Sequence, residues 1–462
     1  MLFNSLQFLL FFVVVSGIYY ALPLKARWIW LLLAGCYFYA VQVPAYIFLL
    51  LATILIDYLT GLGMQAVDLQ SLRKTILIIS ILSNLSILFF FKYFNFWIEN
   101  LQTLSGFFGN RAHYETLSLM LPIGLSFHTF QSMSYSIELY HKRIRAERNP
   151  VVFALYVMFF PQLVAGPIER PQHLLTQLRV KQAFKPDQIK RGFLLLGWGM
   201  IKKVVISDRL ALYSNEVFAH YPAYSFLAVL LAILFFSIQI YCDFSGYSDM
   251  ARGAANVLGY DLMVNFNLPY FAKSLREFWT RWHISLSTWF RDYVYIPLGG
   301  NRKSSMRYTG NILLVFFLSG LWHGSSWNFI LWGMFHGVMM VTQHILRKNG
   351  LVWRGHQNWS VLFNFIFVSF TWIFFRTETP KDAWGMVIHL LTFQTGELHP
   401  YLIPFAQMGF GLMLIIGLGL MEKYRLTKFL DIRNFSFKVI TCALMIYFLG
   451  VFNESLFIYF QF

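Results

Sequence analysis

Long apolar segments follow one another along the whole chain and are separated by short polar connections. Runs of about 17–25 apolar residues are typical of helices that cross a membrane, and these runs lack the alternation of a membrane β-barrel. The pattern predicts an all-α polytopic membrane protein with roughly 11–13 membrane segments, some of them re-entrant or broken. The expected segments cover residues 5–22, 28–44, 46–63, 75–92, 117–140, 151–168, 191–206, 223–246, 308–322, 326–346, 361–375, 405–421 and 437–456.

The polar connections are rich in lysine and arginine. The chain of 462 residues has 37 Lys and Arg against 21 Asp and Glu, a net charge of +16, although only 13% of its residues are charged. In a soluble protein this excess would suggest nucleic acid, but short basic loops between spans follow the positive-inside rule. We therefore expect membrane lipids and no nucleic acid as partners, with both ends of the chain outside the cytoplasm.

One apolar segment, residues 151–168, lies between two basic connections at 141–148 and 179–191. Both connections should be cytoplasmic, so a single crossing cannot join them. Pro161, Gly166 and two further prolines interrupt this part of the chain. Non-helical backbone at membrane depth is tolerated where protein or a cavity surrounds it. The sequence therefore predicts a re-entrant segment here.

A histidine, His323, interrupts an apolar stretch of membrane length. Basic residues lie on both sides of this stretch, at 302–307 and 347–354, which predicts a hairpin over 308–347 with its turn at 323–326. A first arm of about fifteen residues reaches roughly 22 Å. His323 should then lie beyond the middle of a ~30 Å hydrocarbon layer, facing a cavity rather than lipid.

A second histidine, His283, lies in a basic, Trp-rich block at 273–295. If this block is one helix, it is amphipathic and lies at the cytoplasmic interface, with its aromatic side toward lipid or protein. His283 would lie at the margin of the aromatic stripe. The stripe consists of Phe278, Trp282, Leu286, Trp289 and Tyr293.

Imidazole suits general acid or base chemistry because its pKa of about 6.5 is close to neutral pH. His323 is the stronger candidate, and its alternative role is to close the hairpin turn through a hydrogen bond. For His283 a structural role is the leading interpretation from the sequence alone. Two histidines do not complete a zinc site, and the three cysteines are far apart and form no ligand spacing, so we expect no metal.

Two further sets of residues are candidates for binding and transfer. Seven basic residues could collect the phosphates of an anionic cosubstrate on the cytoplasmic side, or could simply set the topology: Arg170, Lys202, Lys203, Arg276, Arg281, Arg291 and Arg302.

The aromatic tail at 457–462 contains Tyr459, a nucleophile on the side toward which His323 points. The alternative is an aromatic belt that anchors the end of the chain. Buried polar residues near 239–249 would either hold helices together or line a tunnel.

At several places the sequence resembles the membrane-bound O-acyltransferase family, and within it the bacterial branch that acetylates exported polysaccharides. The string RWHISLSTWFRDYVYIPLGGNR, at 281–302, is highly specific. The other matching stretches are LPIGLSFHTFQSMSY (121–135), FPQLVAGPIERPQHLLTQL (160–178), YCDFSGYSDMARGAANVLGYDLMVNFNLPY (241–270) and LSGLWHGSSWNFILWGMFHG (318–337).

The resemblance implies His323 as the catalytic histidine and His283 as the second histidine of a family pair, beside a tunnel. It implies a single transmembrane domain over 1–462, with a catalytic core at about 117–346, in a bacterial inner membrane. Acetyl-CoA would be the donor, held by Arg170, Arg276, Arg281 and Arg291, and a periplasmic SGNH-type enzyme would be the partner. The tail also resembles F-x-Y-x-x-F, a motif of the related teichoic-acid system whose tyrosine carries the acyl group; this implies an acyl-carrying Tyr459.

The sequence thus leads to a membrane O-acyltransferase that acetylates an exported polysaccharide, alginate-like in the first instance, through an acetyl-tyrosine intermediate. Peptidoglycan and cellulose are alternative acceptors for the same chemistry. From other classes, a small-solute transporter and a scaffold for a glycan-export complex remain. A transporter would release no free CoA from a thioester, and a scaffold would not depend on either histidine.

Overall fold

The computed structural model describes residues 1–41, 44–109, 115–119, 121–164, 166–302, 304–351, 357–398, 400, 404–452 and 458. Within these residues the chain is helical, and its only pairing of the β type is an isolated bridge between Tyr224 and Glu397. The prediction of an all-α protein is confirmed. The chain forms two compact units, the first comprising Met1–Ile189 with Ala254–Met263 and the second comprising Lys190–Gly253 with Val264–Phe462.

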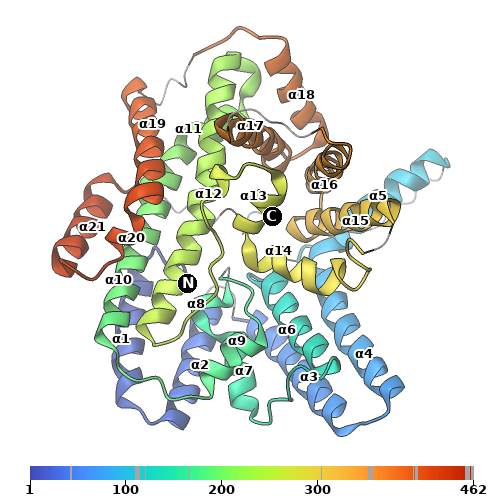
Figure 1. Ribbon diagram of the computed structural model, residues 1–462, viewed down its shortest axis with the longest axis vertical. Helices are drawn as coiled ribbons and strands as arrows, with labels where there is room; N and C mark the ends of the chain where they lie inside the picture. Colours follow the sequence, from blue (N-terminus) through green and yellow to red (C-terminus); the bar gives the residue numbers. More distant parts are fainter. Residues whose placement is uncertain are drawn as a thin grey trace. The chain divides into compact units, whose positions relative to one another are not determined.

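The first unit is a bundle of apolar helices, coloured blue to teal in Figure 1. Its elements are α1 (Leu6–Ala21), α2 (Leu24–Ala40), α3 (Tyr46–Ala66), α4 (Gln70–Leu88), η1 (Phe89–Tyr93), α5 (Phe94–Phe107), α6 (Leu125–Tyr140), α7 (Pro150–Met158), α8 (Phe160–Leu163) and α9 (Pro171–Leu178). Helices α3, α4 and α6 pack against one another, and α2 packs against α7.

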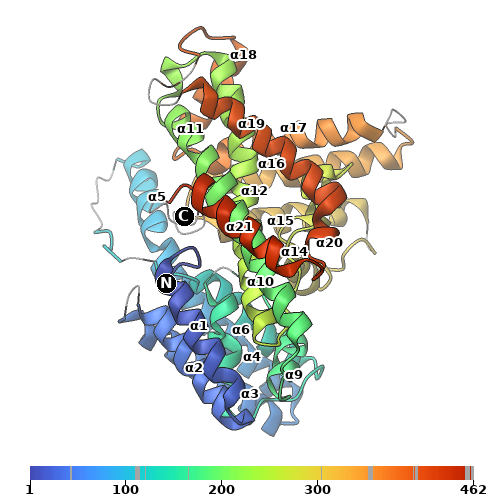
Figure 2. The ribbon, with the colours of Figure 1, turned by 90° about the vertical axis from the view of Figure 1, so that its left-hand side faces the viewer.

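The second unit contains the remaining elements, except that the first residues of α10 and the last residues of α12 are counted with the first unit. They are α10 (Pro186–Met200), η2 (Ile201–Ser207), α11 (Asp208–Ala219), η3 (Tyr221–Ala223), α12 (Phe226–Val257), η4 (Pro269–Phe271), α13 (Leu275–Arg281), α14 (Ile284–Phe290), η5 (Arg291–Tyr295), α15 (Ser305–His323), α16 (Trp327–Lys348), α17 (Gln357–Arg376), α18 (Pro380–Leu391), α19 (Phe405–Leu420), η6 (Met421–Arg425), α20 (Leu426–Phe429) and α21 (Phe435–Leu449). Helices α19 and α21, red in Figure 2, pack against η2.

Among the described residues, six helices are long and apolar enough to cross a membrane. They are Tyr46–Ala66, Gln70–Phe107, Phe226–Val257, Trp327–Lys348, Gln357–Arg376 and Phe405–Tyr424, and α1 and α21 are shorter apolar helices. The predicted multi-pass membrane protein is therefore confirmed. The prediction of one transmembrane domain with a core at 117–346 is not tested by the division into two units and stays a prediction.

Spans α3 and α4 are joined by polar groups inside the first unit. The carboxylate of Asp57 is fully buried and accepts hydrogen bonds from the Ser80 hydroxyl at 2.8 Å and the Asn84 amide at 2.9 Å. Ser80 also pairs with Ser136 of α6 at 2.7 Å. Because lipid offers no hydrogen bonds, these contacts satisfy groups that would otherwise be costly to bury.

The segment predicted to be re-entrant is broken as expected. Helix α7 has nine residues and ends at Met158, and the extended backbone of Phe159 separates it from the four residues of α8. Nine residues extend only about 14 Å, too short to cross a hydrocarbon layer of about 30 Å. The side chains from Leu155 to Val164 are buried within the first unit, so protein surrounds the break.

The region 273–295 differs from a single amphipathic helix. Helix α13 ends at Arg281, Trp282 is extended, and His283 has φ 43° and ψ 54°, in the left-handed region. Four members of the aromatic stripe, from Phe278 to Trp289, are at most 3% exposed, so they face the interior of the second unit. The interpretation as one continuous helix is wrong, because the left-handed backbone conformation of His283 interrupts the helix between α13 and α14.

The predicted hairpin over 308–347 is present as α15 and α16, which lie side by side (Figure 1). Two glycines let the helices approach closely. A Cβ at Gly320 would lie 2.3 Å from the carbonyl oxygen of Phe329, and a Cβ at Gly333 would lie 2.2 Å from that of Phe316. Small residues at such crossings allow backbones to touch, as is common between membrane helices.

Candidate active site

The hairpin places His323 at the last position of α15. Gly324 follows in an extended conformation, and its N–H donates to the carbonyl oxygen of Gly320, which ends the helix. The imidazole of His323 is buried, with its ring centre 4.9 Å from that of Trp332 and 5.3 Å from that of Phe375. The predicted position of this histidine at the turn is confirmed.

The residues that follow His283 are held by hydrogen bonds to Asn265. Asn265 binds the start of α14: its carbonyl accepts from the Ile284 N–H, and its side-chain oxygen accepts from the N–H of Ser285 at 3.1 Å and from the Ser285 hydroxyl at 3.0 Å. The side chain of His283 is fully buried, and its ring centre lies 4.6 Å from that of Phe244. Burial lowers the pKa of His283 to about 3, so this imidazole is neutral at physiological pH.

The two histidines come together although 40 positions separate them in the sequence. Their ring centres are 6.4 Å apart, with 54° between the ring planes. A hydrogen bond to imidazole spans about 3 Å, so a small group between the rings can contact both. Among the described residues, aromatic rings that contact one or both of them include those of Phe244, Trp322, Trp332 and Phe375. Such a shell excludes water and strengthens electrostatic interactions inside it.

A third buried histidine, His336, lies on α16 of the hairpin that carries His323, and no pattern in the sequence singled it out. Its Nε2 lies 3.0 Å from the hydroxyl of Thr371 on α17. Its ring centre is 5.1 Å from that of Trp332, so Trp332 separates it from His323. His336 therefore ties α16 to α17 behind the histidine pair.

Two of the polar residues expected to join helices or line a tunnel, Asp243 and Asp249, form ion pairs in the second unit. Lys203 Nζ lies 2.7 Å from Asp243 and 2.8 Å from Asp208. Its neighbour Lys202 lies 3.1 Å from Asp249 and 3.0 Å from Glu422. Both lysines are buried in η2, so these charges connect η2 to α11, α12 and η6 rather than meeting an external anion.

Of the predicted tail, the structure describes Ile458 alone; Tyr459 lies outside the described residues. The side chain of Ile458 is buried, at 6% exposure, and its backbone N–H donates to Asp243 Oδ2 at 2.7 Å. Asp243 precedes Phe244, whose ring contacts His283. The residue before Tyr459 is thus held inside the second unit.

Residues 75–377 match the family model described as MBOAT, the membrane-bound O-acyltransferase family. The chain belongs to this family. It is 39% identical over 403 residues to a protein of Azotobacter vinelandii named probable alginate O-acetylase, covering 85% of this chain and 78% of that one. It is also 34% identical over 420 residues to the peptidoglycan O-acetyltransferase of Helicobacter pylori, covering 83% and 78%. More distantly, it is 28% identical over 282 residues to the teichoic acid D-alanyltransferase of Bacillus subtilis, covering 57% and 71%.

The family establishes an O-acyltransferase, which sets aside the transporter and scaffold alternatives. Acyltransferases need an acyl donor, and the four arginines predicted to bind it have different surroundings. Arg276 and Arg291 are exposed in the second unit, and Arg291 Nε pairs with Asp292 at 2.8 Å. Arg281 is occupied by Glu277 at 2.6 Å and by the carbonyl of Leu268. Their roles stay predictions.

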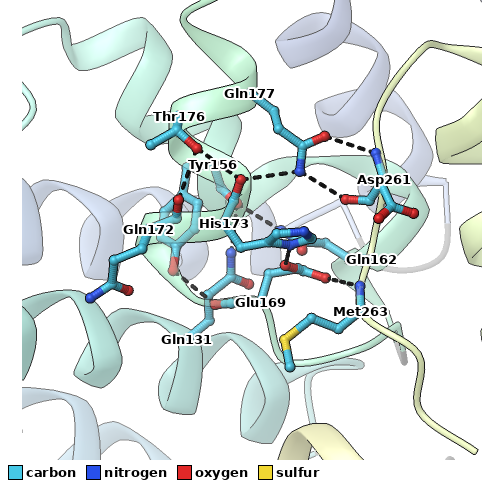
Figure 3. A network of polar contacts seen from close by, with 10 residues as sticks. All are labelled: Gln131, Tyr156, Gln162, Glu169, Gln172, His173, Thr176, Gln177, Asp261 and Met263. Atoms are coloured by element: carbon cyan, nitrogen blue, oxygen red, sulfur yellow. Dashed lines mark hydrogen bonds and ion pairs between the residues drawn. The ribbon is translucent and has the colours of Figure 1, made fainter.

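The remaining arginine, Arg170, lies in the first unit and follows Glu169, a member of a polar network that the sequence pattern did not predict. Figure 3 shows the network around Glu169 and His173. Arg170 Nη1 donates to the Ser134 hydroxyl at 3.2 Å. The carboxylate of its neighbour Glu169 is fully buried, lies 2.6 Å from His173 Nδ1 and accepts from the Met263 N–H at 2.6 Å. Burial raises the pKa of Glu169, and the hydrogen bond to Glu169 raises the pKa of His173.

This network fixes the loop that follows α12. Gln177 strengthens it by bonding both the N–H and the carbonyl of Asp261, at 2.8 and 2.9 Å. The signal in the sequence was a charged residue, Glu169, between prolines in an otherwise apolar segment. Within the described part of the chain, no group of three or more His, Cys, Asp or Glu residues could hold a metal ion.

Proposed function

We propose that this acyltransferase O-acetylates an exported cell-surface polysaccharide of a bacterium, with acetyl-CoA as the cytoplasmic donor and the inner membrane as its location. The names of the two relatives that match at least 78% of their own length support an acetyl group and a glycan acceptor. An alginate-like polymer is the first candidate, and peptidoglycan is the second because of the Helicobacter relative. Measuring the acetyl content of each polymer in a strain that lacks the protein distinguishes the two.

The observation that carries this proposal is the histidine pair. Two buried imidazoles whose ring centres are 6.4 Å apart can act on one acceptor hydroxyl and one thioester carbonyl at the same time. The aromatic shell suits this chemistry, because excluding water protects the thioester from hydrolysis. The exposed Arg276 and Arg291 of the second unit supply positive charge for the phosphates of CoA.

His323 takes the proton from the acceptor hydroxyl as its oxygen attacks the carbonyl carbon of acetyl-CoA. The C–S bond then breaks, and the CoA thiolate leaves and takes up a proton. Neutral His283 donates an N–H to the carbonyl oxygen, on which negative charge develops. The acceptor in this first transfer is the hydroxyl of Tyr459, and an SGNH-type partner outside the membrane moves the acetyl group from the tyrosine to the glycan. A free tyrosine has a pKa of about 10, so it needs a base such as His323.

Intact-mass and peptide mass spectrometry on the purified protein incubated with acetyl-CoA tests this proposal. We expect a gain of one acetyl group on Tyr459, lost in Tyr459→Phe. Tyr447→Phe is the matched control, because Tyr447 is 76% exposed on α21 and should leave the adduct unchanged. CoA release that depends on added glycan, without any adduct on Tyr459, would contradict the tyrosine intermediate and favour direct transfer.

The proposed role of His283 leads to a separate prediction. Asparagine tolerates the left-handed backbone at φ 43° and keeps an N–H donor, whereas leucine of similar size does neither well. We expect His283→Leu to lower kcat by about 10²–10³-fold, as for loss of an oxyanion donor, and His283→Asn to lose clearly less at equal amounts of folded protein. Initial rates of CoA release at several acetyl-CoA concentrations give kcat and KM. Equal activity of the two variants would show that His283 donates no hydrogen bond in the transition state.

A further inference from the structure

The chain after α21 returns into the second unit and is held there through its backbone. The carbonyl of Leu449, at the end of α21, accepts from Arg209 Nη2 at 2.7 Å. The N–H of Val451 donates to the carbonyl of Val204 at 2.8 Å. The N–H of Ile458 donates to Asp243 Oδ2 at 2.7 Å. All three contacts use backbone atoms, and they fix where Leu449, Val451 and Ile458 lie.

One of these contacts is made to η2, a π-helix over Ile201–Ser207, and η2 also pairs with the carboxylate that binds Ile458. Single-turn π-helices are rare and are frequent at functional sites. All seven residues of η2 are buried, including the adjacent Lys202 and Lys203, which pair with different carboxylates. Element η2 thus provides a carbonyl that binds Val451, and it provides Lys203, which pairs with Asp243, the residue that binds Ile458.

Asp243 is suited to bind a backbone N–H. Its carboxylate is 1% exposed, and its two oxygens have different partners: Oδ1 faces Lys203 at 2.7 Å and Oδ2 faces the Ile458 N–H. Lys203 is shared with Asp208, so one ammonium group serves two carboxylates. A buried carboxylate that is only partly neutralised needs further donors, and bonds to such a charged acceptor are about twice as strong as neutral ones.

Asp243 is also adjacent in the chain to a residue that contacts the histidine pair. Asp243 is followed on α12 by Phe244, whose ring centre is 4.6 Å from that of His283. Ile458 is followed by Tyr459. We propose that Asp243, oriented by Lys203, is a docking site for the chain's own C-terminal tail and holds residue 458 so that residue 459 is presented to the histidines. The docking is independent of the proposed function; the presentation of Tyr459 rests on it.

Docking is measured on the full-length protein in detergent by brief digestion with a protease of low specificity, proteinase K, followed by mass spectrometry of the cut sites in the C-terminal tail. Asp243→Leu removes the acceptor, and Ile458→Pro removes the donor without touching the buried ion pairs. The matched controls are Asp208→Asn, which alters the same lysine without contacting the tail, and Ile458→Val, which keeps the N–H. Size-exclusion profiles verify that each variant is folded, and Ile458→Pro keeps the test valid if Asp243→Leu does not fold.

We expect the wild type and both controls to resist cleavage within 453–462, and both test variants to be cut there about 10- to 100-fold faster, as for loss of a hydrogen bond to a charged group. Equal rates in the wild type and in both test variants would overturn the docking site. A protected tail that never gains acetyl on Tyr459 would leave the docking site standing and refute the tyrosine relay. If both test variants gained as much acetyl on Tyr459 as the wild type, Asp243 would not position the tyrosine, although the tyrosine intermediate would stand.

Discussion

Replacing His323 by alanine is expected to lower acyl transfer by about 10²–10⁴-fold, the usual contribution of a general base. The hydroxyl of a tyrosine or sugar is protonated at neutral pH, so without the base its oxygen attacks the thioester slowly. The backbone should tolerate the change, because α15 already ends at this residue and Gly324 continues it in an extended conformation. The measurement is CoA release from acetyl-CoA, together with the thermal unfolding temperature of the same preparation.

His336→Ala is the matched control for this prediction. His336 is buried in the same hairpin and contacts the same Trp332, but its Nε2 pairs with Thr371. We expect it to lower the unfolding temperature and to keep most of the activity per folded molecule. If His323→Ala retained full activity while His336→Ala lost it, the base would have to be assigned to His336.

The hairpin and the position of His323 could be predicted because simple constraints determine them. Basic residues at both ends place those ends on one side of the membrane, and the length of the first arm then places the turn. The pairing of His323 with His283 was different: no periodicity connects residues 40 positions apart, and it was expected only from the family resemblance. In the structure the pairing depends on contacts across the second unit, such as those of Asn265 with the start of α14.

The break at His283 could not be predicted from the sequence pattern. The apolar positions Phe278, Trp282, Leu286 and Trp289 keep a helical spacing across it, so a continuous helix and two short helices fit equally well. A left-handed residue is the physical difference, and here tertiary hydrogen bonds outweigh the local preference against it. The predicted apolar stripe is present, but these four side chains pack inside the protein rather than facing lipid.

The roles and partners of the charged residues could also not be predicted from the sequence pattern. Composition alone does not separate arginines that set topology from those that bind phosphate, and Arg281 illustrates this because Glu277 already occupies it. The buried lysines of η2 could be suspected from their apolar surroundings, but their partners lie up to 220 positions away, as with Lys202 and Glu422. The docking of Ile458 involves a backbone N–H, which every residue except proline has, so no sequence pattern could indicate it.

Gly333→Ala is expected to destabilise the protein by about 1–3 kcal/mol or more, because an added methyl group would lie 2.2 Å from the backbone oxygen of Phe316. The oxygen belongs to the facing helix, so α15 and α16 must separate, and the helix that carries His323 must move. Activity should therefore fall with the folded fraction, although no histidine is changed. The unfolding temperature and the yield of monodisperse protein are the measurements.

Gly310→Ala provides the comparison for Gly333→Ala within the same hairpin. A Cβ at Gly310 meets nothing within 4 Å, so this change adds helix propensity without a clash and should be neutral or stabilising by up to about 1 kcal/mol. Gly320→Ala, with its clash at 2.3 Å, should behave like Gly333→Ala. If all three variants unfolded at the same temperature, the two helices would not approach as closely as the geometry requires. A selective loss at Gly320 and Gly333 would instead tie the position of the proposed base to the contact between these two backbones.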